Sequence, residues 1–136
     1  MSAIPPNMIG RMWPQLAPHI QRVIDVSYED ITLLSIRNKL VEGEATAIAI
    51  SNDGGEIVAV ATFEVTTLES QRRILLVPVI GGDHMEDWAD DFMKLLRELK
   101  QDFACDEIRG AGRPGWVKYL KKYGWKPVMT VVSLED

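Results

Sequence analysis

The sequence has few of the residues from which metal centres and disulfide frameworks are built. It contains one cysteine, Cys105, and two histidines, His19 and His84. A single cysteine excludes an internal disulfide and a multi-cysteine zinc site, and two isolated histidines predict no metal centre. The Ser-His-Asp set, the GxSxG turn and the HExxH pair are also missing, so the residues alone indicate no hydrolytic centre.

Long apolar runs and an excess of positive charge are absent as well. No stretch approaches the roughly 18 apolar residues of a membrane span, and the first residues lack the basic and apolar regions of a secretory signal. The formal charge is −5, which gives no overall attraction to nucleic acid or to an anionic membrane. We therefore expect a soluble protein of a reducing compartment such as the cytoplasm.

The composition is that of an ordinary globular chain. The 136 residues are 46% apolar and 26% charged, and no linker, repeat or low-complexity tract divides them. A chain of this length and composition predicts one domain over residues 1–136 with a core of its own. Pro5 and Pro6 indicate that residues 1–12 form an irregular N-terminal arm.

Two helices are expected next. Pro14 fits the first turn of a helix, where its missing N–H costs nothing, and apolar residues then share one face as far as Ile24. A second helix follows, with Ser27 and Asp30 as candidate caps and Gly43 as its end.

The middle of the chain has the pattern of strands. We expect strands over 46–51, 56–65 and 73–80, the first two joined by a tight turn at Asn52-Asp53-Gly54-Gly55. Pro78 cannot donate to a sheet ladder, so it indicates an edge or a bulge in the third strand.

The strongest helix signal follows Gly81-Gly82. Asp83 is a candidate N-cap with Glu86 three residues later, and the apolar face is made of Trp88, Phe92, Leu95, Leu96, Leu99 and Phe103. A strand over 106–111, a helix from Pro114 to Gly124 and a strand over 127–134 complete the chain. The order α-α-β-β-β-α-β-α-β predicts a mixed α/β (α+β) layer sandwich.

The residues suggest two candidate binding sites. A glycine turn that leads into a helix N-terminus can bind an anion, although Asp83, Glu86 and Asp87 in this turn would repel a phosphate. The second site is the segment 108–134, which has six basic residues and no acidic one. Basic side chains interleaved with aromatic ones are typical of nucleic-acid surfaces; the candidates here are Arg109, Arg113, Lys118, Lys121 and Lys122. In the alternative interpretation the tryptophans, Trp116 among them, belong to the core and the lysines to a solvated helix face.

The element order resembles the GNAT superfamily of N-acetyltransferases over essentially the whole chain. The resemblance implies a mostly antiparallel mixed sheet with helices on both faces. The segment Gly112-Arg113-Pro114-Gly115-Trp116, followed by Lys122-Tyr123-Gly124-Trp125, resembles more closely the small GNAT-like proteins of tailed phages and prophages. These include internal virion proteins of short-tailed phages, so a location in the host cytoplasm or in the virion is implied.

When the acetyltransferase motifs are matched to this sequence residue by residue, some of their functional residues are missing. The resemblance implies that backbone amides of Ile80, Gly81, Gly82 and Asp83 hold the pyrophosphate of acetyl-CoA, but the Arg or Gln that usually precedes the glycines is missing. The usual general-acid tyrosine is replaced by Leu120, so Glu64 is left as the candidate general base. Arg113 stands where the family often has Asn, and is a candidate either for an anionic ligand or for a pair with Asp83 or Asp87.

Three functions remain open at this point. The first is a phage or prophage accessory or virion-associated protein that acts by binding. The second is an active N-acetyltransferase that uses acetyl-CoA, and the third is a nucleic-acid-binding protein. A homodimer is also expected, because the strand Thr130–Leu134 would be an uncapped apolar edge.

Overall fold

A five-stranded sheet forms the centre of the computed structural model, which describes residues 1–27, 31–111 and 114–135. The strand order is β1-β2-β3-β4-β5; β1 to β4 are antiparallel, and β5 lies parallel to β4. The strands are β1 (Ser2–Ile4), β2 (Thr46–Ser51), β3 (Ile57–Thr67), β4 (Arg73–Gly82) and β5 (Glu107–Gly110). The helices are α1 (Ile9–Val26), α2 (Leu33–Glu42), α3 (Met85–Asp102) and α4 (Pro114–Leu120), with short 3-10 turns η1 (Pro6–Met8) and η2 (Lys121–Tyr123).

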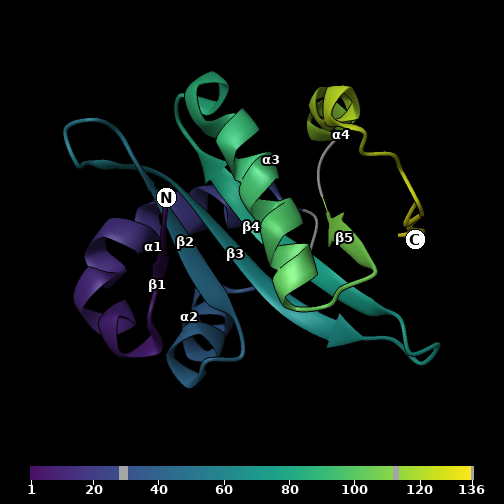
Figure 1. Cartoon of the computed structure of the whole chain (residues 1–136), viewed down its shortest axis with the longest axis horizontal. Helices are drawn as coiled ribbons and strands as arrows, with labels where there is room; N and C mark the ends of the chain where they lie inside the picture. Colours follow the sequence, from purple (N-terminus) through teal and green to yellow (C-terminus); the bar gives the residue numbers. More distant parts are fainter. Residues whose placement is uncertain (28–30, 112–113, 136) are drawn as a thin grey trace.

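Helices cover both faces of this sheet (Figure 1). On one face α1 and α2 enclose an apolar cluster around Leu16, Ile20 and Leu40. On the other face α3 packs across the strands through Trp88 and Phe92. The mixed α/β architecture with helices on both faces, expected from the sequence, is therefore confirmed.

The first residues are more regular than expected. Residues 1–12 were expected to be an irregular arm, but β1 pairs with β2, η1 follows, and α1 already begins at Ile9. Ile4 and Ile9 are buried, and the burial of these two side chains orders the segment despite its prolines. Pro14 lies inside α1 instead of opening it, and Pro18 lies inside the same helix.

Two helix starts also differ from the expectation. The cap of α2 is Thr32, whose side chain accepts a hydrogen bond from the Ser35 amide, and the expected cap Asp30 lies outside the described residues. The N-cap of α3 is His84, in the left-handed region at φ 59°, and Asp83 does not cap the helix. Asp83 instead forms an ion pair with α1, as described below.

The turns and the bulge follow the sequence prediction. Gly43 ends α2 at φ 78°, and Gly55 adopts φ 81° in the β2–β3 turn. Pro78 lies opposite the register shift between Thr62 and Glu64 of β3, and pairing of β4 with β5 ends one residue earlier, at Val77.

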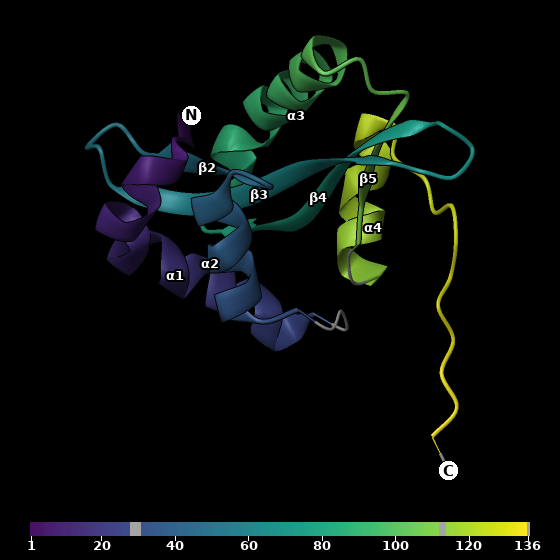
Figure 2. The ribbon, with the colours of Figure 1, turned by 90° about the horizontal axis from the view of Figure 1, so that it is seen from below.

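The expected last strand does not form. Residues 124–135 make no strand pairing in the described structure; Trp125 still packs against Met93, and the chain after it extends away from the body (Figure 2). The side chains of Val128, Met129, Val131, Val132 and Leu134 are 59–87% exposed. A strand needs a partner for its backbone groups, and within the described chain this segment has none.

Candidate functional site

The turn between β4 and α3 brings together four of the predicted site residues. Ile80, Gly81 and Gly82 are the last residues of β4 and pair with Ala61, Val60 and Ala59 of β3. Asp83 follows directly, so the sequence prediction places these residues in one turn at the start of a long helix. What this turn can bind depends on which of its backbone N–H groups are free to donate a hydrogen bond, and on how much space lies beside it.

Both glycines are required by close packing. A Cβ at Gly82 would lie 2.3 Å from the Val58 carbonyl oxygen and 2.4 Å from the Ala59 Cα, and the φ of +151° also favours glycine. A Cβ at Gly81 would lie 2.5 Å from Cγ2 of Val23 on α1. The glycines therefore let β3 and α1 approach the turn, and this packing accounts for them without a ligand.

The backbone of Asp83 is already bonded within the protein. Its N–H donates to the Val58 carbonyl at 2.9 Å, and its carbonyl accepts from the Trp88 indole N–H at 2.8 Å. An amide committed to β3 is not available to a phosphate oxygen. The turn thus lacks one of the four donors that the family resemblance implies.

The charge around the turn is negative apart from one arginine. The Asp83 carboxylate pairs with Arg22 of α1 at 3.3 Å, and Glu86 and Asp87 occupy the first turn of α3. These acids already complement the positive end of the helix dipole. The donor set, the packing and the charge together do not fit the pyrophosphate of acetyl-CoA.

The Arg22 guanidinium lowers the pKa of the Asp83 carboxyl, first through the hydrogen bond and then through its charge. A depressed pKa in the folded state adds stability above the ordinary pKa of the acid, and this stability is lost as the pH falls through the folded value. Arg22→Gln is expected to return the Asp83 pKa towards its ordinary range. A side-chain carboxyl titration by NMR measures this, with Glu107, whose pKa is lowered by Arg109 and Arg72 and not by Arg22, as an internal control. An unchanged Asp83 pKa would contradict the assignment.

The structure places Glu64 far from this turn. Ala59, the partner of Gly82, lies five residues before Glu64 on β3, so about 17 Å of strand separates Glu64 from the Gly82 end of the turn at 3.3 Å per residue. The Glu64 carboxylate bonds the Lys39 ammonium of α2 at 3.2 Å. Glu64 thus forms an ion pair that links α2 to β3, and its role as a general base stays a prediction.

The open part of the sheet lies between β4 and β5. The two strands pair from Ile74–Glu107 to Val77–Gly110, whereas β4 continues from Pro78 to Gly82 without a partner on that side. Pro78 removes one N–H from this free edge. A ligand could lie along the edge, but it would find one donor fewer than in an unbroken strand.

The basic residues of the segment 108–134 differ in what they contact. Arg109 bonds Glu107 at 3.1 Å, and Arg72 binds the same carboxylate, so the pKa of Glu107 is lowered, mainly by Arg109. Lys122 stacks over the Tyr119 ring at 4.1 Å. Lys118 and Lys121 are exposed, and Arg113 lies outside the described residues. Among the described residues of this segment, Lys118, Lys121 and the exposed Lys126 form no ion pair, and three such lysines are a small footprint for nucleic acid.

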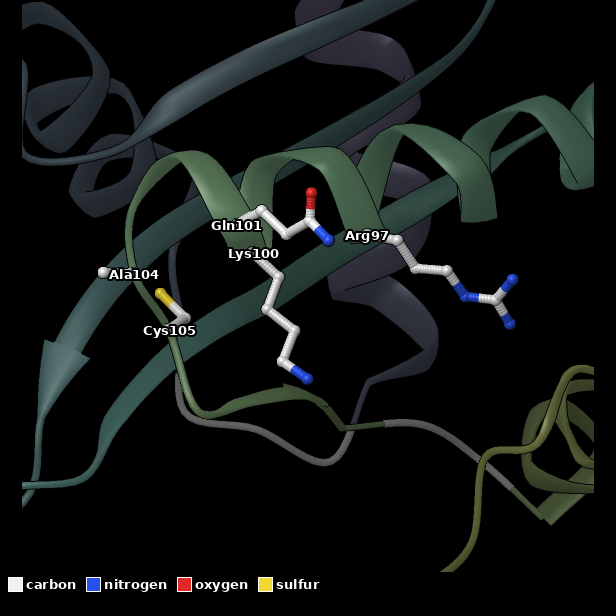
Figure 3. A pocket seen from close by; sticks show the side chains of 5 residues that line it. All are labelled: Arg97, Lys100, Gln101, Ala104 and Cys105. Carbon is white, nitrogen blue, oxygen red and sulfur yellow. The ribbon is translucent and has the colours of Figure 1, made fainter.

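A shallow hollow along α3 was not found from the sequence (Figure 3). It has a volume of about 460 Å³ and is lined by Arg97, Lys100, Gln101, Ala104 and Cys105. A neighbouring groove of about 320 Å³ shares Arg97 and Lys100 and continues along β5 to Trp125. No local sequence pattern predicts these two hollows, because they depend on how α3, β5 and the chain after η2 pack together.

The described part of the chain has neither a membrane-spanning helix nor a cluster of metal ligands. None of its helices is long and apolar enough to cross a membrane. Within residues 1–27, 31–111 and 114–135, no cluster of three or more His, Cys, Asp or Glu side chains could hold a metal ion.

The chain has a GNAT-like fold. Solved structures similar to it include a ribosomal-protein-alanine N-acetyltransferase from Brucella melitensis biovar Abortus 2308, with a TM-score of 0.71, 13% identity and coverage of 99% of this chain and 98% of that one. A "predicted acetyltransferase" from Clostridium acetobutylicum, solved with acetyl-CoA, has a TM-score of 0.70 and 13% identity over 98% of this chain and 94% of that one.

An aminoglycoside acetyltransferase from an uncultured soil metagenomic sample is also similar, with a TM-score of 0.71 and 15% identity over 99% of this chain and 96% of that one. No family model matches the sequence, and no curated protein matches it. At these identities the likeness establishes the fold, and the function must be argued from the site.

Proposed function

We propose that this chain is a GNAT-fold protein that acts by binding, as an accessory or virion-associated protein of a tailed phage or prophage, and that it does not transfer acetyl groups. The observation that carries the proposal is the state of the β4–α3 turn. The Asp83 amide is bonded to Val58, and the space beside Gly81 and Gly82 is taken by α1 and β3.

The catalytic side supports the same proposal. Leu120 stands where the resemblance places a general acid, and the Glu64 carboxylate is engaged in an ion pair with Lys39. The resemblance of residues 112–116 to small phage proteins supports the phage assignment, although Gly112 and Arg113 lie outside the described residues.

Calorimetric titration with acetyl-CoA and with CoA tests the proposal. We expect no binding, which corresponds to a dissociation constant above about 1 mM, because the turn offers too few donors and carries three acids. An active GNAT enzyme titrated under the same conditions is the positive control. Micromolar binding together with acetylation of an amine acceptor would overturn the proposal. Detection of the chain in purified phage particles would test the virion assignment separately.

One observation favours an active N-acetyltransferase as the second candidate. The edge of β4 from Pro78 to Gly82 is free of β5, which leaves room for an extended ligand beside it. The same titration separates the two candidates, since an enzyme that uses this edge must bind CoA.

A further inference from the structure

We propose that Trp116, Tyr119 and Tyr123 form an aromatic binding site for a quaternary ammonium group, and that the side-chain ammonium of Lys122 occupies this site when no ligand is bound. The three aromatic residues lie on α4 and η2, at the β5 end of the sheet (Figure 2). The proposal does not depend on whether the chain binds acetyl-CoA.

The Lys122 ammonium lies close to two tyrosine rings. Its Nζ atom is 4.1 Å from the centroid of the Tyr119 ring and 5.3 Å from that of the Tyr123 ring. The two centroids are 6.0 Å apart, and the rings are inclined to each other at 49°. Both Nζ distances are within the roughly 6 Å at which a cation is attracted to the negative face of an aromatic ring. An ammonium group is thus already held where the cation of a ligand would bind.

Trp116 extends the aromatic surface beyond the two tyrosines. Its ring meets the Tyr119 ring edge-on, with centroids 5.7 Å apart. Trp116 and Tyr119 are half-buried, yet in the described structure neither is part of the two apolar clusters that form the core. Tyr123 does pack against the core, which fixes one side of the site. Two of the three rings are therefore free of a packing role in the core and can contact a ligand.

Asp90 of α3 places a negative charge beside the rings. Its carboxylate accepts a hydrogen bond from the Tyr123 hydroxyl at 2.7 Å, and within the described residues it forms no ion pair. This hydrogen bond raises the pKa of Tyr123, so the phenol stays protonated and the ring neutral. The carboxylate charge is left uncompensated by a basic side chain, which favours a cation at the neighbouring rings.

The other charges near the site are of both signs. Those on the adjoining turns of α3, α4 and η2 are Glu86, Asp87, Asp91, Lys94, Lys118 and Lys121. The groove that Tyr123 also lines adds three basic and two acidic side chains. Binding replaces the Lys122 ammonium by the cation of the ligand, so the charge at the rings is unchanged and no overall attraction is required.

A quaternary ammonium group fits these rings better than the lysine ammonium does. The lysine ammonium is strongly hydrated, and the Lys122 side chain is exposed to water. A quaternary ammonium has no N–H group to hydrate, and its methyl groups contact aromatic faces directly. Lys122 competes because it is tethered beside the site. A tethered occupant weakens the apparent affinity of a ligand according to the fraction of time for which the site is free.

Titration with choline tests the proposal, with the uncharged carbon analogue of choline as the comparison ligand. The indole N–H resonance of Trp116 in NMR spectra of the full chain reports binding. The wild type is expected to bind choline in the millimolar range, and Lys122→Ala about tenfold more tightly because the competing ammonium is gone. The carbon analogue has the same shape without the charge and is expected to bind neither protein.

Two further variants separate the site from a general effect of charge. Lys118→Ala removes a lysine of the same helix that contacts no ring in the described structure, and should leave the choline dissociation constant unchanged. Tyr119→Leu, combined with Lys122→Ala, removes one ring and should weaken binding at least about tenfold while the rest of the spectrum is retained.

The proposal is wrong if Lys122→Ala shows no saturable shift of the Trp116 resonance at tens of millimolar choline. It is also wrong if the carbon analogue binds as tightly as choline, because the rings would then act as a plain apolar surface. Equal gains for Lys118→Ala and Lys122→Ala, or binding that survives Tyr119→Leu, would overturn it as well.

Discussion

Replacing Trp88 by alanine is expected to lower the free energy of unfolding by about 4 kcal/mol, the largest effect of a single substitution that we predict. The side chain is 5% exposed and packs edge-on against Phe92 with ring centroids 6.0 Å apart. Its indole N–H also binds the Asp83 carbonyl, so the residue joins α3 to the turn after β4. Equilibrium unfolding in urea measures the loss.

Two further variants separate the contributions. Trp88→Phe keeps much of the apolar contact and removes the hydrogen bond, so it should lose less than Trp88→Ala. Trp116→Ala is the matched control, because the core interpretation of the sequence places Trp116 inside the protein as well. Trp116 is half-buried and contacts Tyr119 at a centroid distance of 5.7 Å, so about 1 kcal/mol is expected. Equal losses for Trp88 and Trp116 would contradict the assignment of Trp88 as the anchor.

The features that the sequence predicted well are local ones. The apolar face of α3 could be read from its spacing, and Trp88, Phe92 and Leu96 are indeed buried. Phe103 does not complete this face, because the helix ends at Asp102 and the Phe103 side chain is 42% exposed beside Phe63. Spacing locates a helix more reliably than it locates the end of that helix.

The features that the sequence missed join distant parts of the chain. Arg22 and Asp83 are 61 residues apart, and no periodicity or motif connects an arginine of α1 with a carboxylate after β4. The same holds for Lys39 and Glu64. Both ion pairs involve predicted site residues, Asp83 and Glu64. In each case the carboxylate is bonded to a basic side chain of another element, which the sequence prediction did not include.

The tail shows why strand propensity is an incomplete signal. Residues 127–134 have the composition of a strand, yet none forms in the described chain because the ladder needs a second edge. The three residues of β1 form a strand with a weaker sequence signal because β2 lies beside them. A strand is thus decided by its neighbour, which the local sequence does not contain.

Gly82→Ala is expected to lower the free energy of unfolding by about 3 kcal/mol, the second largest effect. The new Cβ would lie 2.3 Å from the Val58 carbonyl oxygen and 2.4 Å from the Ala59 Cα, both backbone atoms of β3. Because backbone cannot rotate away as a side chain can, β3 and β4 would have to separate locally. Thermal or urea unfolding measures this loss without any ligand.

Gly55→Ala is the control that isolates the close approach. Gly55 also has a positive φ, +81°, but a Cβ there would meet nothing within 4 Å, so only the backbone cost of about 1 kcal/mol is expected. If both variants lost the same stability, the close approach of β3 would not be the reason for Gly82, and a role of this glycine in ligand binding would stay open. If Gly82→Ala alone is severely destabilised, β3 packing accounts for this glycine, and its resemblance to a cofactor-binding glycine carries no catalytic implication.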